Sequence, residues 1–300
     1  MAHITLTEKT AMIGLVVGCI IFGLGSLIVA YVPIGAYAIA FWRLLVAAII
    51  FYILASLFKQ IAPISKQAKH YALISGAFLG LDLALWHESI YAVGPGISTL
   101  LNSLQIFWLS AIGFFWFHER QSKLQLFSLC LAVFGVALIG SPEFKQNQNA
   151  LWGFISGIVS GLMLALSMVY IRKTQQAAVT PIFPLMFRVS VGGMLILLLP
   201  ALWLNSTQLY PTTWEQVGLV LVYGAIMQCL AWGMIAYSIP LLSLSVTGLL
   251  LLSEPVAALI IDYVLLHKAI NGLQWCGAFL TMLAIYLGSL RPNKTEHKKI

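Results

Sequence analysis

Long apolar runs separated by short polar breaks dominate this chain. Each run is about 20 residues long, which is the length that an α-helix needs to cross a bilayer. Unpaired peptide groups are too costly in lipid for other structures, and closed barrels show alternating rather than continuous apolar positions. The sequence therefore predicts an all-α integral membrane protein with ten transmembrane helices, at about 11–31, 36–58, 71–92, 95–117, 123–141, 150–171, 181–204, 215–238, 242–266 and 272–290.

The composition agrees with a protein that lies in lipid. Of the 300 residues 61% are hydrophobic and only 8% are charged, whereas about a quarter of a soluble domain is charged. The four cysteines, Cys19, Cys130, Cys229 and Cys276, fall singly inside predicted helices without the paired spacing of metal ligands. We expect them to be buried packing thiols, and we predict no metal site and no cofactor.

The distribution of lysine and arginine predicts the orientation. If the amino terminus is cytoplasmic, only Lys145 and Lys268 fall in outside loops. The inside segments then hold Lys9, Lys59, Lys66, Lys69, Arg120, Lys123, Arg172, Lys173, Arg291, Lys294, Lys298 and Lys299. This bias follows the positive-inside rule and predicts a multi-pass protein with both termini cytoplasmic. We expect its membrane to be a bacterial inner membrane. The bias also explains the net charge of +7, so no nucleic-acid partner is predicted and the basic tail is expected to meet anionic lipid.

The two halves of the chain resemble each other. The matched residues are Arg43 with Arg188, Asp82 and Trp86 with Gln228 and Trp232, and Gly14 and Gly18 with Gly153 and Gly157. The four-residue spacing of these glycines lets helices approach closely. Each half has five predicted helices, an odd number, so the second copy enters the membrane from the opposite side. We therefore predict two inverted five-helix repeats, 1–145 and 146–290, followed by a basic cytoplasmic tail, 291–300.

Several of these features together resemble a known family. They are the ten helices in two halves, the arginine in the second helix of each half, the FHER ending of the fourth helix and the SEP segment at 253–255. The sequence resembles the drug/metabolite transporter superfamily, specifically its EamA-like proteins, along nearly its whole length. Phe107 replaces the family's usual proline and His267 an expected acid, which leaves the subfamily open. The resemblance implies a secondary carrier for small polar metabolites or drugs, with a central cavity lined mainly by helices 1, 3, 4, 6, 8 and 9.

Ionisable side chains within the predicted spans are candidates for function, because each costs at least about 2.5 kcal/mol to insert. Asp82 and Trp86 are four residues apart and share a helix face, as Gln228 and Trp232 do. An indole can stack on a planar or cationic ligand that the polar group orients, although helix packing explains the tryptophans as well. Asn102 and Gln105, three residues apart, add neutral hydrogen-bonding groups.

Glu254 lies close to the predicted bilayer centre and is followed by Pro255. Proline lacks a backbone N–H and crowds the preceding turn, so we expect a kink near residues 251 and 252. A kink beside an acid suits ligand or proton binding, and Glu254 and Asp82 are the candidates for proton coupling. The alternative for Glu254 is a structural bond or ion pair with a neighbouring helix.

Other polar and proline residues are predicted to have structural or gating roles. Arg43 and Glu88 lie towards the outer side, where they can form an ion pair, and Arg188 lies towards the inner side without an equivalent acid. We expect both arginines to act as anchors that reach the interface or bond helix-end carbonyls. His87 and Asp262 are further ionisable residues within the spans. Pro95 and Pro240 mark related corners where small dihedral changes can move gates.

These observations favour a secondary active transporter over an enzyme. His87 and Glu88 begin a zinc-protease motif whose second histidine is replaced by Tyr91, and no nucleophile elbow or phosphate-binding loop is present. We expect alternating-access transport of a small polar metabolite, such as an amino acid or a related zwitterion or cation, with proton coupling as a hypothesis. The alternatives are a multidrug exporter of cationic compounds and an intramembrane lipid-modifying enzyme. A monomer and a homodimer both stay open.

Overall fold

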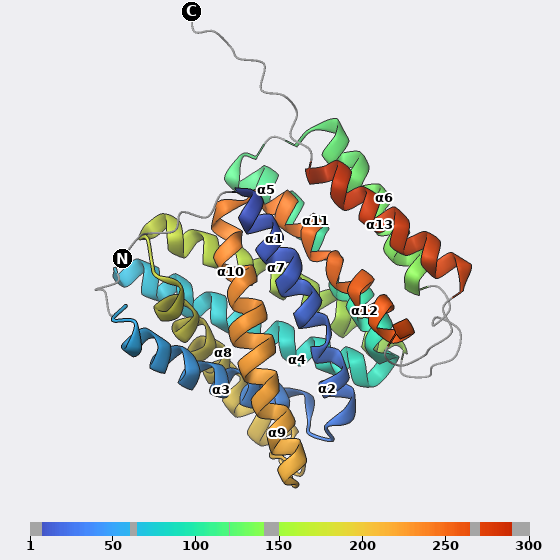
Figure 1. Ribbon diagram of the computed structural model, residues 1–300. Coiled ribbons are helices and arrows are strands. Elements are labelled where there is room, and N and C mark those ends of the chain that lie inside the picture. Colours follow the sequence, from blue (N-terminus) through green and yellow to red (C-terminus); the bar gives the residue numbers. More distant parts are fainter. Residues whose placement is uncertain (1–7, 61–64, 120, 141–149, 265–270, 290–300) are drawn as a thin grey trace, which may run out of the picture.

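The protein was analysed as a computed structural model that describes residues 8–60, 65–119, 121–140, 150–264 and 271–289. These residues form helices and no strand (Figure 1). The elements are α1 (Glu8–Gly23), α2 (Gly25–Tyr31), α3 (Ala36–Leu57), α4 (Lys66–Asn102), α5 (Gln105–Phe117), α6 (Lys123–Gly140), α7 (Ala150–Ala177), α8 (Ile182–Leu204), α9 (Trp214–Val222), the π-helix η2 (Tyr223–Trp232), α10 (Gly233–Ser238), the 3-10 helix η3 (Ile239–Leu241), α11 (Leu244–Leu251), α12 (Ser253–Val264) and α13 (Gly272–Ser289).

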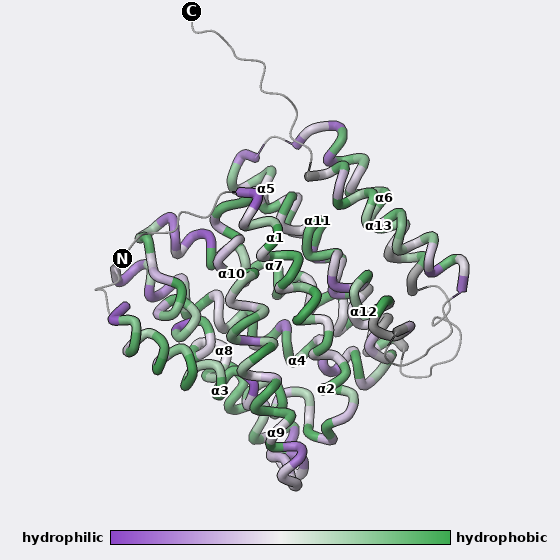
Figure 2. Tube along the Cα trace, in the orientation of Figure 1, coloured by the Kyte–Doolittle hydropathy of each residue, from purple (hydrophilic) through white to green (hydrophobic). Residues whose placement is uncertain are grey.

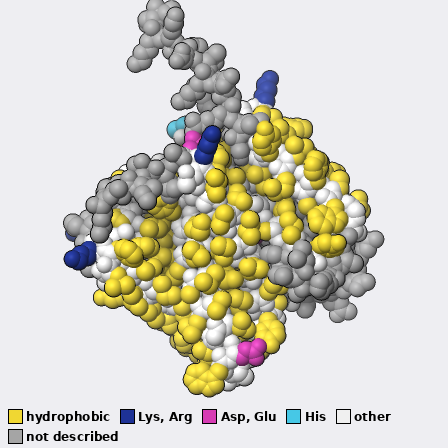
Figure 3. All heavy atoms as spheres, in the orientation of Figure 1, with side chains coloured by type: hydrophobic (Ala, Val, Ile, Leu, Met, Phe, Trp, Pro, Cys, Tyr) yellow, Lys and Arg dark blue, Asp and Glu magenta, His cyan; other side chains and the backbone are white. Residues whose placement is uncertain are grey.

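Five helical stretches in the described residues are long and apolar enough to cross a membrane: Glu8–Tyr31, Ala36–Leu57, Leu151–Ala177, Ile182–Leu204 and Trp214–Leu241. Hydrophobic positions dominate the helices (Figure 2), and hydrophobic side chains cover most of the face in Figure 3, with charged ones at its margins. The predicted all-α membrane class is therefore confirmed. The predicted basic tail, Lys145 and Lys268 lie outside the described residues, as does the side chain of Asp262.

Three expected spans differ in detail from the helices observed. The predicted turn at Pro95 lies inside the long α4, which is kinked at Gly94, where φ is 83° and glycine is the residue that adopts it without strain. The predicted span 95–117 is interrupted at Ser103 and Leu104, between α4 and α5. The predicted span 242–266 is interrupted at Leu252, which confirms the break expected from Pro255.

Packing between helices brings distant parts of the chain together. The long α4 packs most extensively against α7 and α8, and α3 also packs along α8. The pair α6 and α13 lies side by side at one edge of the bundle (Figure 1). The first helix, α1, lies against η2, α10 and α12. The helix α3 lies against both η2 and α4.

Glycines allow some of these helices to approach closely, as their spacing predicted. A β-carbon on Gly18 would lie 2.8 Å from the Ala231 carbonyl oxygen, and one on Gly157 would lie 2.8 Å from Leu101. By contrast, the nearest atom at Gly14 is 3.6 Å away, which is an ordinary contact. Close approach is therefore confirmed for Gly18 and Gly157.

Gly76 offers a test of the packing between α4 and α8. A β-carbon there would overlap the Val189 carbonyl, and backbone cannot move aside as a flexible side chain can. Overpacking costs about 1–3 kcal/mol, so we expect Gly76→Ala to lower the melting temperature of the purified protein by several degrees. Gly218→Ala is the matched control, because nothing lies within 4 Å of that position. Equal melting temperatures for the two variants would contradict this account.

Candidate functional site

Arg43, on α3, lies fully buried in the middle of the bundle. Its side chain is 0% exposed, and its Nε donates to Gln228 Oε1 at 2.7 Å. The guanidinium carbon lies 4.6 Å from the ring centre of Phe22 and 4.4 Å from that of Tyr223, within cation–π range. The expected outer ion pair between Arg43 and Glu88 is therefore wrong, because the side chain of Arg43 is directed to η2 instead.

Glu88 and Arg188 have separate partners. Glu88 Oε2 accepts a hydrogen bond from Trp152 Nε1, on α7, at 3.2 Å. Arg188 Nη1 donates to the Pro184 carbonyl at 2.8 Å, four residues earlier in the same helix. Arg188 thus bonds a helix carbonyl as predicted for an anchor, whereas Arg43 does not, so the two matched arginines differ in their surroundings.

Phe22 joins the two tryptophans that the sequence paired. Its ring centre lies 6.1 Å from that of Trp86, on α4, and 6.0 Å from that of Trp232, at the end of η2. Both tryptophans are buried, at 3% and 1% exposed. Gln228 and Trp232 both lie in the π-helix of 10 residues, a rare conformation that is often found at functional sites. The two predicted faces therefore meet around one phenylalanine.

A second polar group surrounds Asp82. Its side chain is only 3% exposed, and its Oδ1 accepts from Asn102 Nδ2 at 2.9 Å. The same Asn102 amide donates to Ser160 Oγ, on α7, at 2.9 Å. Gln105 is also buried, at the start of α5, but its Oε1 has no partner among the described residues. Asp82 and Asn102, both candidate site residues, are thus in direct contact, while Gln105 takes no part in this contact.

Glu254 lies in the first turn of α12, just after the break at Leu252. It lies beside Gly23 of α1, where an added β-carbon would be 3.6 Å from the Glu254 Cγ. Its carboxylate is partly buried and interacts electrostatically with Arg43 and Asp82, but it makes no hydrogen bond or ion pair within the described residues. Pro255 is buried next to it. The acid therefore lies close to the other charges of the core without a fixed partner.

Sequence reasoning missed the roles of Phe22 and Tyr223. His87 Nδ1 lies 3.1 Å from the Ala36 carbonyl, which can only accept, so this nitrogen carries a proton. In the neutral ring His87 Nε2 then accepts from the Tyr223 hydroxyl at 2.8 Å. Tyr223 thus connects His87 to Arg43. The sequence gives no signal for this, because aromatic residues are common in apolar helices for packing alone.

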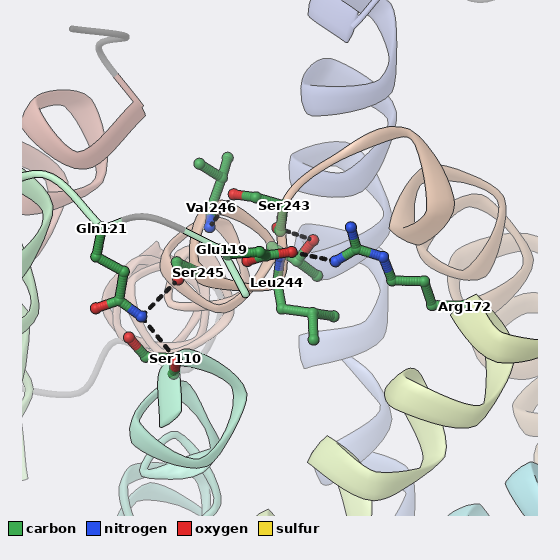
Figure 4. Close-up of polar contacts among 9 residues, drawn as sticks. Ser110, Glu119, Gln121, Arg172, Ser243, Leu244, Ser245 and Val246 are labelled. Atoms are coloured by element: carbon green, nitrogen blue, oxygen red, sulfur yellow. Dashed lines mark hydrogen bonds and ion pairs between the residues drawn. The ribbon is translucent and has the colours of Figure 1, made fainter. Parts of the chain in front are cut away.

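A polar network ties three helices at the end of the bundle where α5 finishes (Figure 4). Glu119 forms an ion pair with Arg172 of α7 and accepts from the backbone N–H of Leu244, at the start of α11, at 3.1 Å. Gln121 Nε2 donates to the Ser110 carbonyl at 2.7 Å and to Ser245 Oγ at 3.2 Å. We call Glu119, Arg172 and the Leu244 N–H the α5–α11 lock. From the sequence, Glu119 was noted in the FHER ending, but its contacts with Arg172 and Leu244 were not predicted.

A largely apolar cavity of about 490 Å³ lies between α1, α8, η2 and α10. Its wall includes Cys229, the residue after Gln228, together with Gly14, Phe51 and Phe183. It therefore borders the same π-helix that holds part of the buried polar cluster, but its own lining offers few polar groups.

The cysteines and acids do not form a metal site in the part of the chain that the structure describes. All four cysteines are free thiols. Cys19 is buried, as expected, but Cys130 and Cys276 are exposed on α6 and α13. That expectation was wrong for these two because a thiol is apolar enough to face lipid as readily as the protein core.

Buried polar side chains enclosed by an apolar helical bundle are characteristic of membrane proteins that handle polar solutes. The comparisons with known proteins identify the group more closely. The chain belongs to the EamA-like transporter family, whose sequence model matches residues 9–141 and 151–290. The predicted resemblance is therefore confirmed, and at the level of the family the chain is a transporter rather than an enzyme.

Two curated relatives and one solved structure are similar to the chain. A Salmonella typhimurium protein named "Probable amino-acid metabolite efflux pump" is 25% identical over 209 residues, which are 66% of this chain and 68% of the relative. A chloroplastic WAT1-related protein of Arabidopsis thaliana is 24% identical over 67% of this chain, which spans only 49% of that protein. A solved crystal structure with 11% identity has a TM-score of 0.73 and covers 94% of this chain and 96% of its own. It supports the fold alone.

Proposed function

We propose that the protein is a secondary active transporter that moves a small amino-acid-type metabolite across the membrane by alternating access. The observation that carries this proposal is the buried polar cluster formed by side chains of α3, α4, η2 and α12 around Phe22 of α1. The substrate-binding residues in this proposal are Asp82, Trp86, Asn102, Gln105, Gln228, Trp232 and Glu254. The printed name of the Salmonella relative supports an amino-acid metabolite as the substrate class.

The proposed architecture has ten spans in two inverted repeats, 1–145 and 146–290, followed by the cytoplasmic tail. The helix breaks support this, because Leu104 and Leu252 occupy matched positions when Phe107 is aligned with Pro255. Their dihedral angles are also similar, at φ −63° and ψ −9° for Leu104 and φ −68° and ψ −6° for Leu252. The lysine and arginine distribution supports cytoplasmic termini in a bacterial inner membrane.

Alternating access requires that one end of the bundle opens while the other is tied. The α5–α11 lock ties one end. At the opposite end the loop before α3 meets the loop after α8, where the Gly35 N–H donates to the Gln208 carbonyl at 3.0 Å and Trp42 Nε1 donates to the Leu209 carbonyl at 2.7 Å. Each of these two sets of contacts consists of only a few hydrogen bonds, so each can break within a transport cycle. Pro95 and Pro240 are proposed hinges at the two ends.

Exchange in liposomes tests the transport function. Purified protein is reconstituted with an unlabelled mixture of the common amino acids inside, and the entry of each labelled amino acid is measured. We expect exchange well above that of protein-free liposomes for a subset of them. Gln228→Leu should reduce this exchange at least tenfold, because a buried site that loses a hydrogen-bonding group leaves its partners unpaired. Exchange at the protein-free rate for every amino acid would refute the proposed substrate class.

A further inference from the structure

The buried cluster around Phe22 contains hydrogen-bond donors without acceptors. Arg43 Nη1 and Nη2, Trp86 Nε1, Gln228 Nε2 and Trp232 Nε1 are all buried and have no hydrogen-bond partner among the described residues. Arg43, Trp86 and Trp232 each pack against the Phe22 ring, and Gln228 is bonded to Arg43. These atoms belong to α3, α4 and η2, so three helices bring their unused N–H groups to one region. All of these groups are hydrogen-bond donors, so the cluster favours a ligand with several hydrogen-bond acceptor atoms.

Charge also selects the ligand. An arginine is always protonated and costly to place in a membrane interior without a partner. Of the described ion pairs none includes Arg43. Its two terminal nitrogens have no hydrogen-bond partner of good geometry among the described residues, although the Tyr223 hydroxyl, Asp82 and Glu254 interact with the guanidinium electrostatically. The planar guanidinium binds a carboxylate through two parallel hydrogen bonds. The Nε of Arg43 already donates to Gln228, so the arginine side chain is oriented before a ligand binds.

From these observations we infer that Arg43, with Gln228 and the indole N–H groups of Trp86 and Trp232, binds the carboxylate group of the transported solute. This rests on the proposed function and narrows it to carboxylate-bearing solutes such as α-amino acids. Asp82 and Glu254 are then available for an ammonium group of the same solute. A cationic compound without a carboxylate would leave Arg43 unpaired, so the site disfavours the alternative of a cationic multidrug exporter.

A matched set of probes tests the inference by binding to the purified full chain. Phenylalanine carries both charged groups, phenylalaninamide lacks the carboxylate and 3-phenylpropionate lacks the amine. Affinity is measured by quenching of tryptophan fluorescence and by thermal shift. We expect phenylalanine to bind about 10- to 100-fold more tightly than phenylalaninamide, which is the range for hydrogen bonds to a charged group. In Arg43→Gln this ratio should fall close to one.

Two conservative tryptophan variants provide a second test in case Arg43→Gln does not fold. Trp232→Phe and Trp86→Phe keep an aromatic ring and remove only the indole N–H, and each should lower the ratio severalfold. Arg188→Gln is the control, because that arginine bonds the carbonyl of Pro184 on its own helix and should leave the ratio unchanged.

Equal affinity for phenylalanine and phenylalaninamide in the unmodified protein, or binding of none of the three probes, overturns the carboxylate site. An unchanged ratio in Arg43→Gln, or in both tryptophan variants if Arg43→Gln does not fold, overturns it as well. Transport that persists without this preference refutes the carboxylate site alone. A preserved preference without exchange in liposomes refutes the transporter proposal alone.

Discussion

Uptake driven by a proton gradient is expected to fall at least tenfold when Glu254 is replaced with glutamine. A side-chain amide does not bind or release a proton at physiological pH, yet it has nearly the shape of the carboxyl group. Glu254 is the stronger candidate for coupling because its carboxylate makes no hydrogen bond within the described residues and lies beside α1, next to the helix break at Leu252. A carboxylate without a fixed partner can exchange a proton without first breaking a bond.

Asp82→Asn is the companion variant. Asp82 accepts a hydrogen bond from Asn102, and an asparagine oxygen can accept the same bond, so this variant keeps the contact and loses only the negative charge that would hold an ammonium group of the solute. We therefore expect Asp82→Asn to weaken substrate binding more than it weakens the use of the proton gradient. The separation is measured by comparing exchange without a gradient with uptake driven by a pH difference, in the same liposomes.

Glu215→Gln is the matched control for both variants. Glu215 lies in the first turn of α9 and accepts a hydrogen bond from the Tyr31 hydroxyl at 3.1 Å in an exposed contact. Losing its charge should leave gradient-driven uptake within about twofold of the unmodified protein, because exposed polar contacts contribute little. If uptake driven by the gradient is unchanged in both Glu254→Gln and Asp82→Asn, neither acid couples transport to protons.

Much of the fold could be predicted from the apolar runs. Helix positions and the membrane class follow from length and hydrophobicity, and the kink before Pro255 follows from the missing N–H of proline. The break at Leu104 could not be predicted in this way, because Phe107 stands where the matched segment has proline. A helix interruption without proline or glycine depends on tertiary packing, here against Gly161 of α7 next to the Asn102 carbonyl.

The sequence identified several residues of the candidate site, but it did not predict most of the contacts between them. Trp86 and Trp232 were matched between the two halves and do meet across the bundle, whereas the bond between Asp82 and Asn102 was not predicted. The predicted contacts of Arg43 were wrong, because distance from a helix end indicates how deep a residue lies but not which way its side chain points. Arg43 turns to Gln228 since η2 is the neighbour of α3 on that side.

The α5–α11 lock is expected to control access from its end of the bundle. Glu119 contacts α7 through Arg172 and α11 through the Leu244 N–H, so one carboxylate ties three helices. Hydrogen bonds to a charged group contribute about 1.5–3 kcal/mol each, which corresponds to a shift of tenfold or more in the population that is open at this end. Glu119→Ala removes both contacts and should give the largest shift. Glu119→Gln keeps an oxygen for Leu244 but loses the ion pair, so it should give a smaller one.

A reporter cysteine at Ser245 measures this opening. Ser245 is only 2% exposed and bonds Gln121 beside the lock, so a membrane-impermeant thiol reagent reaches it only when this end opens. In a protein whose four native cysteines are replaced, Glu119→Ala should raise the rate of labelling about tenfold or more. Glu215→Ala, which removes an acid bonded to Tyr31 outside the lock, should leave the rate unchanged. Equal labelling rates in Glu119→Ala and its parent would contradict this role of the lock. The Glu119 carboxylate would then not stabilise the closed state, and other contacts would hold this end closed.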